Sequence, residues 1–187
     1  GAEIFIVDAG WECPPNEENK WGEYNGINIP NPDRYPHGIS EVRDYCHSKG
    51  MKFGLWVDIE NLGNKTEIYE KHPEWRSRTI IGNKSNNLID MSIPEAAEWA
   101  ENELARIISE YKLDLLRVDH NVSFRDYFTM RNGECTNIRH IQAVYAMYQN
   151  LKRRFPEVIF ENCAGGGART DLGMMKNFNH TWVSDWQ

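Results

Sequence analysis

The chain repeats one pattern along its length: a short apolar run that ends in polar or acidic residues, followed by a segment with helical spacing. We expect strands at residues 3–8, 52–58, 113–119, 157–162 and 180–185. We expect helices between them at 39–49, 66–71, 92–111, 138–155 and 171–176. Alternation of this kind predicts an α/β fold in which parallel strands are joined by crossover helices.

Each of these strands ends in residues suited to chemistry. They are Asp8, Asp58 with Glu60, Asp119, Glu161 with Asn162, and Ser184 with Asp185. A doubly wound sheet concentrates its site at one switch point, whereas a (β/α)8 (TIM) barrel draws site residues from many strand ends, so the barrel is favoured. A complete barrel needs eight strands and about 250 residues. The chain of 187 residues is therefore expected to form part of one, with five strands.

Local signals place the helix ends and the long loops. Ser40 is expected to cap the helix at 39–49, with Gly50 just past its end. Ser92 is expected to cap the longest helix, with Glu95 completing a capping box. The proline-rich segment 13–36 is longer than an ordinary connection, which indicates a functional or disordered loop. Residues 124–137 are expected to form a polar loop.

Composition excludes some classes of partner. The net charge of −7, without any basic run, argues against a nucleic-acid surface. No apolar run approaches the ~20 residues that cross a membrane. The four cysteines lack the spacing of a disulfide framework or a zinc site, which favours a reducing, cytoplasmic compartment. The six histidines show no metal-ligand spacing, so no metal or other cofactor is predicted.

The strand at 113–119 carries the most distinctive polar residues. Arg117, Asp119 and Asn121 alternate along the chain and should share one face. A buried carboxylate needs a partner, and Arg117 is expected to pair with Asp119 and to lower its pKa. A purely structural ion pair would explain this trio equally well.

Two strand-end carboxylates could meet across the mouth of a barrel. A nucleophile and a general acid/base suffice to cleave a glycosidic bond, and Asp119 and Asp185 are the candidates. The acid must hold a proton in the first step, so we expect apolar neighbours at Trp182, Val183 and Trp186 to favour that state in Asp185.

Six motifs occur in an order that resembles one enzyme family. They are Val7-Asp8-Ala9-Gly10-Trp11, Gly54-Leu55-Trp56-Val57-Asp58-Ile59-Glu60, His72-Pro73-Glu74-Trp75, Leu116-Arg117-Val118-Asp119-His120-Asn121, the stretch from Glu161 to Gly173, and Val183-Ser184-Asp185. Together they resemble the catalytic domain of the α-galactosidases (melibiases) of glycoside hydrolase family 36. The resemblance implies that residues 1–187 form part of one catalytic barrel, covering its second to sixth strands.

The resemblance also implies a retaining mechanism without a cofactor and assigns a role to each matched residue. Asp119 matches the nucleophile and Asp185 the general acid/base. The other matched positions line or flank the sugar pocket: Asp8, Trp56, Arg117 (where the family usually has Lys), Asn121, Cys163 and Gly166. Lys84 stands where many members have Arg.

Ala9 departs from the family pattern, in which a second aspartate holds sugar hydroxyls. A methyl group accepts no hydrogen bond, so recognition at C4 or C6 of the sugar must differ. We therefore expect a preference for a sugar that differs from galactose, or carries a substituent, at one of these carbons.

Three functions follow from these residues. The first is hydrolysis of terminal α-galactoside-type linkages in an oligosaccharide or other glycoside. The second is transglycosylation of the raffinose-synthase type, in which a sugar intercepts the glycosyl-enzyme. The third is a fragment that binds carbohydrate without catalysis. A homo-oligomer is compatible with the full-length protein.

Overall fold

The computed structural model describes residues 1–78, 85–121, 130–131 and 133–186. Within these residues, five strands form a parallel sheet in the order β1 (Ile4–Val7), β2 (Lys52–Val57), β5 (Leu115–Val118), β8 (Ile159–Asn162) and β9 (His180–Thr181). Every neighbouring pair in this order is parallel. The predicted architecture of a partial (β/α)8 barrel with five parallel strands is confirmed.

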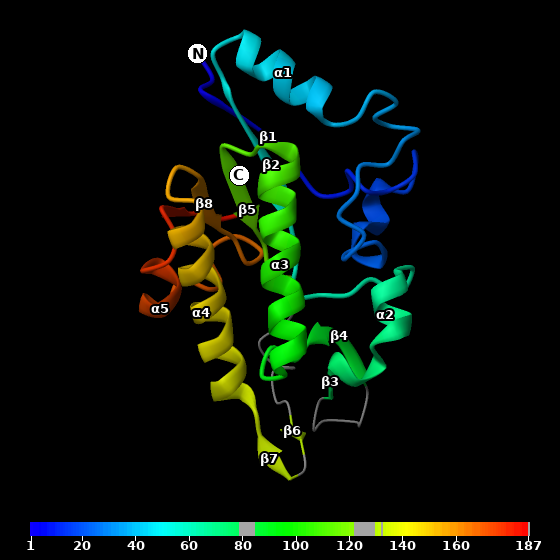
Figure 1. Ribbon diagram of the computed structural model, residues 1–187, viewed down its shortest axis with the longest axis vertical. Coiled ribbons are helices and arrows are strands. Elements are labelled where there is room, and N and C mark those ends of the chain that lie inside the picture. The colour runs from blue at the N-terminus through cyan, green and yellow to red at the C-terminus, as the bar shows by residue number, and fades with distance from the viewer. Residues whose placement is uncertain (79–84, 122–129, 132, 187) are drawn as a thin grey trace.

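The helices lie on one side of the sheet, as Figure 1 shows for α1 (Ser40–Ser48), α3 (Pro94–Tyr111) and α4 (Asn137–Arg154). The side chains that face them form one buried apolar cluster. It includes Phe53, Leu55 and Val57 of β2, Leu116 and Val118 of β5, and Phe160 of β8. A doubly wound sheet would cover both faces with helices, whereas a barrel leaves its inner face to layers of side chains.

Shorter elements complete the described chain. They are the 3-10 helices η1 (Glu18–Glu23) and η2 (Pro73–Trp75), the helices α2 (Glu67–Lys71) and α5 (Leu172–Met175), and two antiparallel pairs. One pair joins β3 (Arg76–Arg78) to β4 (Ser85–Ile89), and the other joins β6 (Met130–Arg131) to β7 (Glu134–Cys135). The β6–β7 pair lies within the predicted polar loop 124–137, so that prediction is wrong for these four positions. Residues 122–129 and Lys84 lie outside the described residues.

Three predictions of element ends are corrected. The last strand stops at Thr181 rather than 185, because only Glu161 and Asn162 of β8 pair with it. Ser40 and Ser92 are not caps: α1 begins after Ile39 and α3 after Ile93, and neither end has a side-chain cap. Pro94, with its fixed φ, begins α3 instead. The predicted end of α1 is confirmed by Gly50, whose φ of +73° is suited to glycine.

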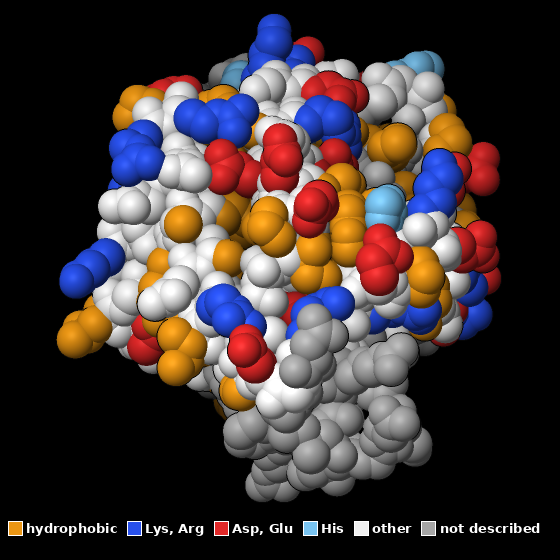
Figure 2. Space-filling view, turned by 60° about the horizontal axis from the view of Figure 1, so that its bottom comes forward, with side chains coloured by type: hydrophobic (Ala, Val, Ile, Leu, Met, Phe, Trp, Pro, Cys, Tyr) orange, Lys and Arg blue, Asp and Glu red, His pale blue; other side chains and the backbone are white. Residues whose placement is uncertain are grey.

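The surface is mixed in character. On the face shown in Figure 2, acidic, basic and hydrophobic side chains are interspersed. Among the described helices, none combines the length and the apolar character needed to cross a bilayer.

Candidate active site

The strand register brings four large side chains into one row across the inner face of the sheet. Trp56 on β2 pairs with Arg117 on β5, Arg117 with Glu161 on β8, and Glu161 with His180 on β9. Asp119 follows β5 and lies two residues beyond Arg117, so it is one step nearer the carboxyl end of the sheet. Residues spaced by two project to the same side of a strand, which places Arg117 and Asp119 on the inner face, as expected.

A cavity of about 320 Å³ opens above this row. It is lined by Asp8, Ala9, Trp21, Trp56, Arg117, Asp119, Asn121, Cys163, Trp182 and Asp185. The structure therefore brings together seven of the eight predicted site residues, and the eighth, Gly166, packs directly behind Asp185. Trp21 was not predicted: it comes from η1 in the long loop 13–36 and packs edge-on against Trp56, with ring centroids 5.1 Å apart.

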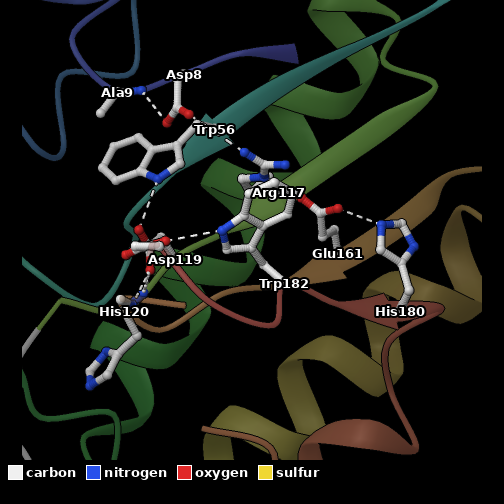
Figure 3. A network of polar contacts seen from close by, with 11 residues as sticks. Asp8, Ala9, Trp56, Arg117, Asp119, His120, Glu161, His180 and Trp182 are labelled. Carbon is white, nitrogen blue, oxygen red and sulfur yellow. Dashed lines mark hydrogen bonds and ion pairs between the residues drawn. The ribbon is translucent and has the colours of Figure 1, made fainter. Parts of the chain in front are cut away.

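Asp119 is a buried carboxylate held by neutral donors. Its Oδ1 accepts hydrogen bonds from the backbone N–H of His120 (2.8 Å) and of Gly165 (3.0 Å). Its Oδ2 accepts one from the indole N–H of Trp56 at 3.1 Å, as Figure 3 shows. Burial alone would raise the pKa of Asp119, but these bonds and one from the Asn121 side chain hold it below the ordinary value. The carboxylate is therefore ionised near neutral pH.

Asp185 lies in a different environment. It is exposed, and its Oδ1 accepts a hydrogen bond from the indole N–H of Trp182 at 3.0 Å. Of the three predicted apolar neighbours, Trp182 contacts Asp185, but Val183 and Trp186 are 84% and 93% exposed, so these two do not enclose it in apolar surroundings. The carboxylate follows β9, where the backbone is no longer held by strand pairing.

Arg117 does not pair with Asp119, so that prediction is wrong. Its Nε donates to Glu161 Oε1, and its Nη1 lies 3.5 Å from Asp8 Oδ2. The guanidinium carbon lies 4.5 Å from the centre of the Trp182 ring. The reason is the register: Glu161 is the direct cross-strand neighbour of Arg117, whereas Asp119 lies just beyond the end of β5.

The glycine-rich turn after β8 lies against both candidate catalytic residues. Gly165 donates its N–H to Asp119, and Gly166 adopts a φ of +85°. A Cβ on Gly166 would lie 3.0 Å from the backbone nitrogen of Asp185, so only glycine allows this approach without displacement. Cys163 is buried, and burial together with the Asp119 charge raises the pKa of its thiol to about 12. A protonated thiol serves as a packing group in the cavity wall.

A second polar cluster lies buried behind Asp119 and was not predicted. Glu60 Oε1 accepts from Arg169 Nη1 at 2.6 Å, and Glu60 Oε2 lies 3.6 Å from His120 Nδ1 and 3.4 Å from His140 Nε2. Burial alone would raise the pKa of Glu60, but the Arg169 charge and a hydrogen bond with His140 lower it below the ordinary range. Burial lowers the pKa of His120 to about 4, so this ring is neutral.

Asp58 is also buried and is linked to the cavity wall through Asn121. Its Oδ2 accepts from the Asn61 side chain at 2.6 Å and from the backbone N–H of Asn121 at 3.4 Å. Burial raises the pKa of Asp58 to about 7, and the charges of Glu60 and Asp119 act in the same direction. Within the described ranges, no group of His, Cys, Asp and Glu side chains is arranged to hold a metal ion.

Fold and site together define the class: a partial parallel β/α barrel whose carboxylates and indoles gather around a cavity at the carboxyl ends of its strands. The sequence profile of the melibiase family matches residues 1–187, the whole chain. The chain belongs to the melibiase family.

Curated relatives and solved structures agree with this family. Alpha-galactosidase 2 of Pediococcus pentosaceus is 30% identical over 195 residues, covering 99% of this chain and 26% of the relative. The α-galactosidase of Lactobacillus brevis superposes with a TM-score of 0.84 at 28% identity, covering 98% of this chain and 25% of that one. A family 36 α-galactosidase of Geobacillus stearothermophilus, solved in complex with raffinose, gives a TM-score of 0.84 at 23% identity, which shows the shared fold. It covers 99% of this chain and 26% of that one. The chain thus spans about a quarter of the length of these relatives.

Proposed function

We propose that the protein containing this chain hydrolyses terminal α-galactoside-type linkages with retention of configuration. Asp119 acts as the nucleophile and Asp185 as the general acid/base. The observation that carries the proposal is the contrast between two carboxylates on one cavity. Asp119 is buried, has a lowered pKa and accepts several hydrogen bonds, whereas Asp185 is exposed and accepts one from Trp182. Two carboxyl groups in unlike environments are what an acid and a nucleophile require.

In the first step, Asp119 attacks the anomeric carbon while Asp185 gives its proton to the departing glycosidic oxygen. A glycosyl-enzyme ester forms and the aglycone leaves. In the second step, Asp185 takes a proton from water, which attacks the same carbon and releases Asp119. Asp8, Trp56, Arg117, Asn121, Cys163 and Gly166 form or support the sugar pocket in this proposal. Oligosaccharides with a terminal α-galactosyl residue are the proposed substrates, since the relatives are named α-galactosidases.

The roles are tested in the full-length enzyme with aryl α-galactosides and azide. Asp119→Ala should lose turnover, and azide should restore it with an inverted, β-galactosyl azide product. Asp185→Ala should keep activity on activated leaving groups, which need little protonation, and azide should yield the α-azide. Equal losses of both variants on good and poor leaving groups would contradict the assignment. Product analysis with added sugar acceptor separates hydrolysis from transglycosylation.

A further inference from the structure

Arg117 is held from three sides at the edge of the cavity. Its Nε donates to Glu161, its Nη1 reaches toward Asp8, and its guanidinium plane lies over the Trp182 ring. Figure 3 shows the guanidinium between the carboxylates of Asp8 and Glu161. The Arg117 side chain is only 11% exposed, so its position is set by these protein contacts rather than by solvent.

Glu161 uses both carboxylate oxygens in this arrangement. Oε1 accepts from Arg117, and Oε2 pairs with His180 Nε2. The Glu161 side chain is 5% exposed, and a carboxylate so buried is costly unless its oxygens are paired. Since Arg117, Glu161 and His180 are direct cross-strand neighbours, the strand register itself sets their order.

The two partners of Arg117 differ in their relation to the cavity. Arg117 and Asp8 line it, whereas Glu161 is not among the described residues that do. Glu161, which lies outside the cavity lining, therefore fixes the orientation of Arg117, which is part of the lining. Arginine can bridge two carboxylates because its donors form a planar fork, and a lysine nitrogen at this position could not hold the same geometry.

We propose that Glu161 is a positioning residue of the candidate sugar site, acting through Arg117. It holds the guanidinium toward Asp8, so that the remaining N–H groups of Arg117 face the substrate, and His180 holds Glu161 in turn. The inference rests on the proposed function and deepens it. In this arrangement, the part of the cavity lined by Arg117 would receive a hydrogen-bond acceptor of the sugar.

A double-mutant cycle in the full-length enzyme tests this role. Glu161→Gln keeps the shape of the side chain and removes its charge, and Arg117→Met removes the guanidinium at similar length. Losing the charge of one partner in a buried hydrogen-bonded pair should lower kcat/KM for aryl α-galactosides at least about tenfold, chiefly through KM. In the Arg117→Met background, the same Glu161→Gln change should alter kcat/KM by less than about threefold. The loss should be equal for good and poor leaving groups, because Glu161 transfers no proton.

Glu157→Gln, an exposed change just before the same strand, is the matched control and should leave KM unchanged. Thermal unfolding of every variant separates misfolding from misplacement of Arg117. The inference is overturned if Glu161→Gln lowers kcat/KM by the same factor in both backgrounds, or lowers only the thermal midpoint. It also falls if the native enzyme cleaves no α-galactoside, an outcome that refutes the proposed function as well. An active native enzyme with an additive cycle refutes the role of Glu161 alone.

Discussion

Replacing Trp56 with phenylalanine should weaken the hold on the ionised form of Asp119. The substitution removes one donor, the indole N–H that lies 3.1 Å from Asp119 Oδ2. It keeps an aromatic ring against Trp21. The donors on the other oxygen, the backbone N–H groups of His120 and Gly165, stay in place. The change therefore isolates one hydrogen bond to a charged acceptor.

The size of the effect follows from the kind of bond. A hydrogen bond to a charged group contributes about 1.5–3 kcal/mol, and one pKa unit corresponds to about 1.4 kcal/mol. Because water can replace part of the lost bond, the pKa of Asp119 should rise by about 1 unit. As the proposed nucleophile, Asp119 must be ionised, so the acidic limb of the kcat/KM profile should move about 1 unit toward higher pH.

The assay is the pH dependence of kcat/KM for an aryl α-galactoside with a good leaving group. Trp182→Phe is the matched control, because it removes the equivalent donor from Asp185 and leaves Asp119 untouched. It should leave the acidic limb in place and act mainly on poor leaving groups. If Trp56→Phe lowers kcat/KM equally at all pH values, the indole does not stabilise the ionised form and the reasoning fails.

Three further outcomes are expected in the full-length protein. Gly166→Ala should lower both kcat and the thermal midpoint, because the new Cβ would lie 3.0 Å from the backbone of Asp185 at a φ of +85°; unchanged kinetics would contradict the close packing. Asp58→Asn should stabilise the protein above pH 4, by an amount that grows to at most about 4 kcal/mol near pH 7. The reason is that the pKa of Asp58 is raised from 3.8 to about 7 in the folded protein, so the native residue destabilises the fold increasingly as pH rises through that window. A difference in denaturant midpoint that does not depend on pH would refute this. Ala9→Asp should raise kcat/KM for plain galactosides relative to galactosides altered at C4 or C6, and no improvement in an enzyme that already prefers galactose would show that recognition is achieved elsewhere.

The fold was predictable because its signals are local and repeated. Apolar runs such as 52–57, each followed by a helical segment, define the parallel order without knowledge of contacts, and all five strands were found. The ends of the helices and strands were predicted less accurately, because neighbouring residues gave competing signals. At the start of α3, Pro94 outweighed Ser92, and the last strand is short because its pairing with β8 covers two residues.

The sequence predicted which residues gather around the cavity, but not which of them form hydrogen bonds and ion pairs with one another. Seven of the eight predicted residues line one cavity, since strand ends converge in a barrel. The partner of Arg117 was missed because cross-strand neighbours depend on register, which the sequence does not state. Glu161 nevertheless carried a signal: it is an acidic residue in a strand otherwise expected to be buried, and such a charge needs a partner from the next strand. The cluster around Glu60 was missed for the same reason, although Glu60, His120 and Arg169 all lie in the quoted motifs.

The pair of Arg117 and Glu161, which was not predicted, changes which groups control the charge of the candidate site. The charge of Arg117 is directed to Glu161 and Asp8, whereas Asp119 is held by neutral dipoles from the backbone and from Trp56. In the proposed function, the cation that faces the sugar and the donors that keep Asp119 ionised are therefore different groups. Arg117→Lys should raise KM, because one nitrogen cannot bridge both carboxylates. It should leave the acidic limb of the pH profile unchanged, because the donors to Asp119 are intact. A shift of that limb in Arg117→Lys would mean that the guanidinium charge, and not the dipoles, keeps Asp119 ionised.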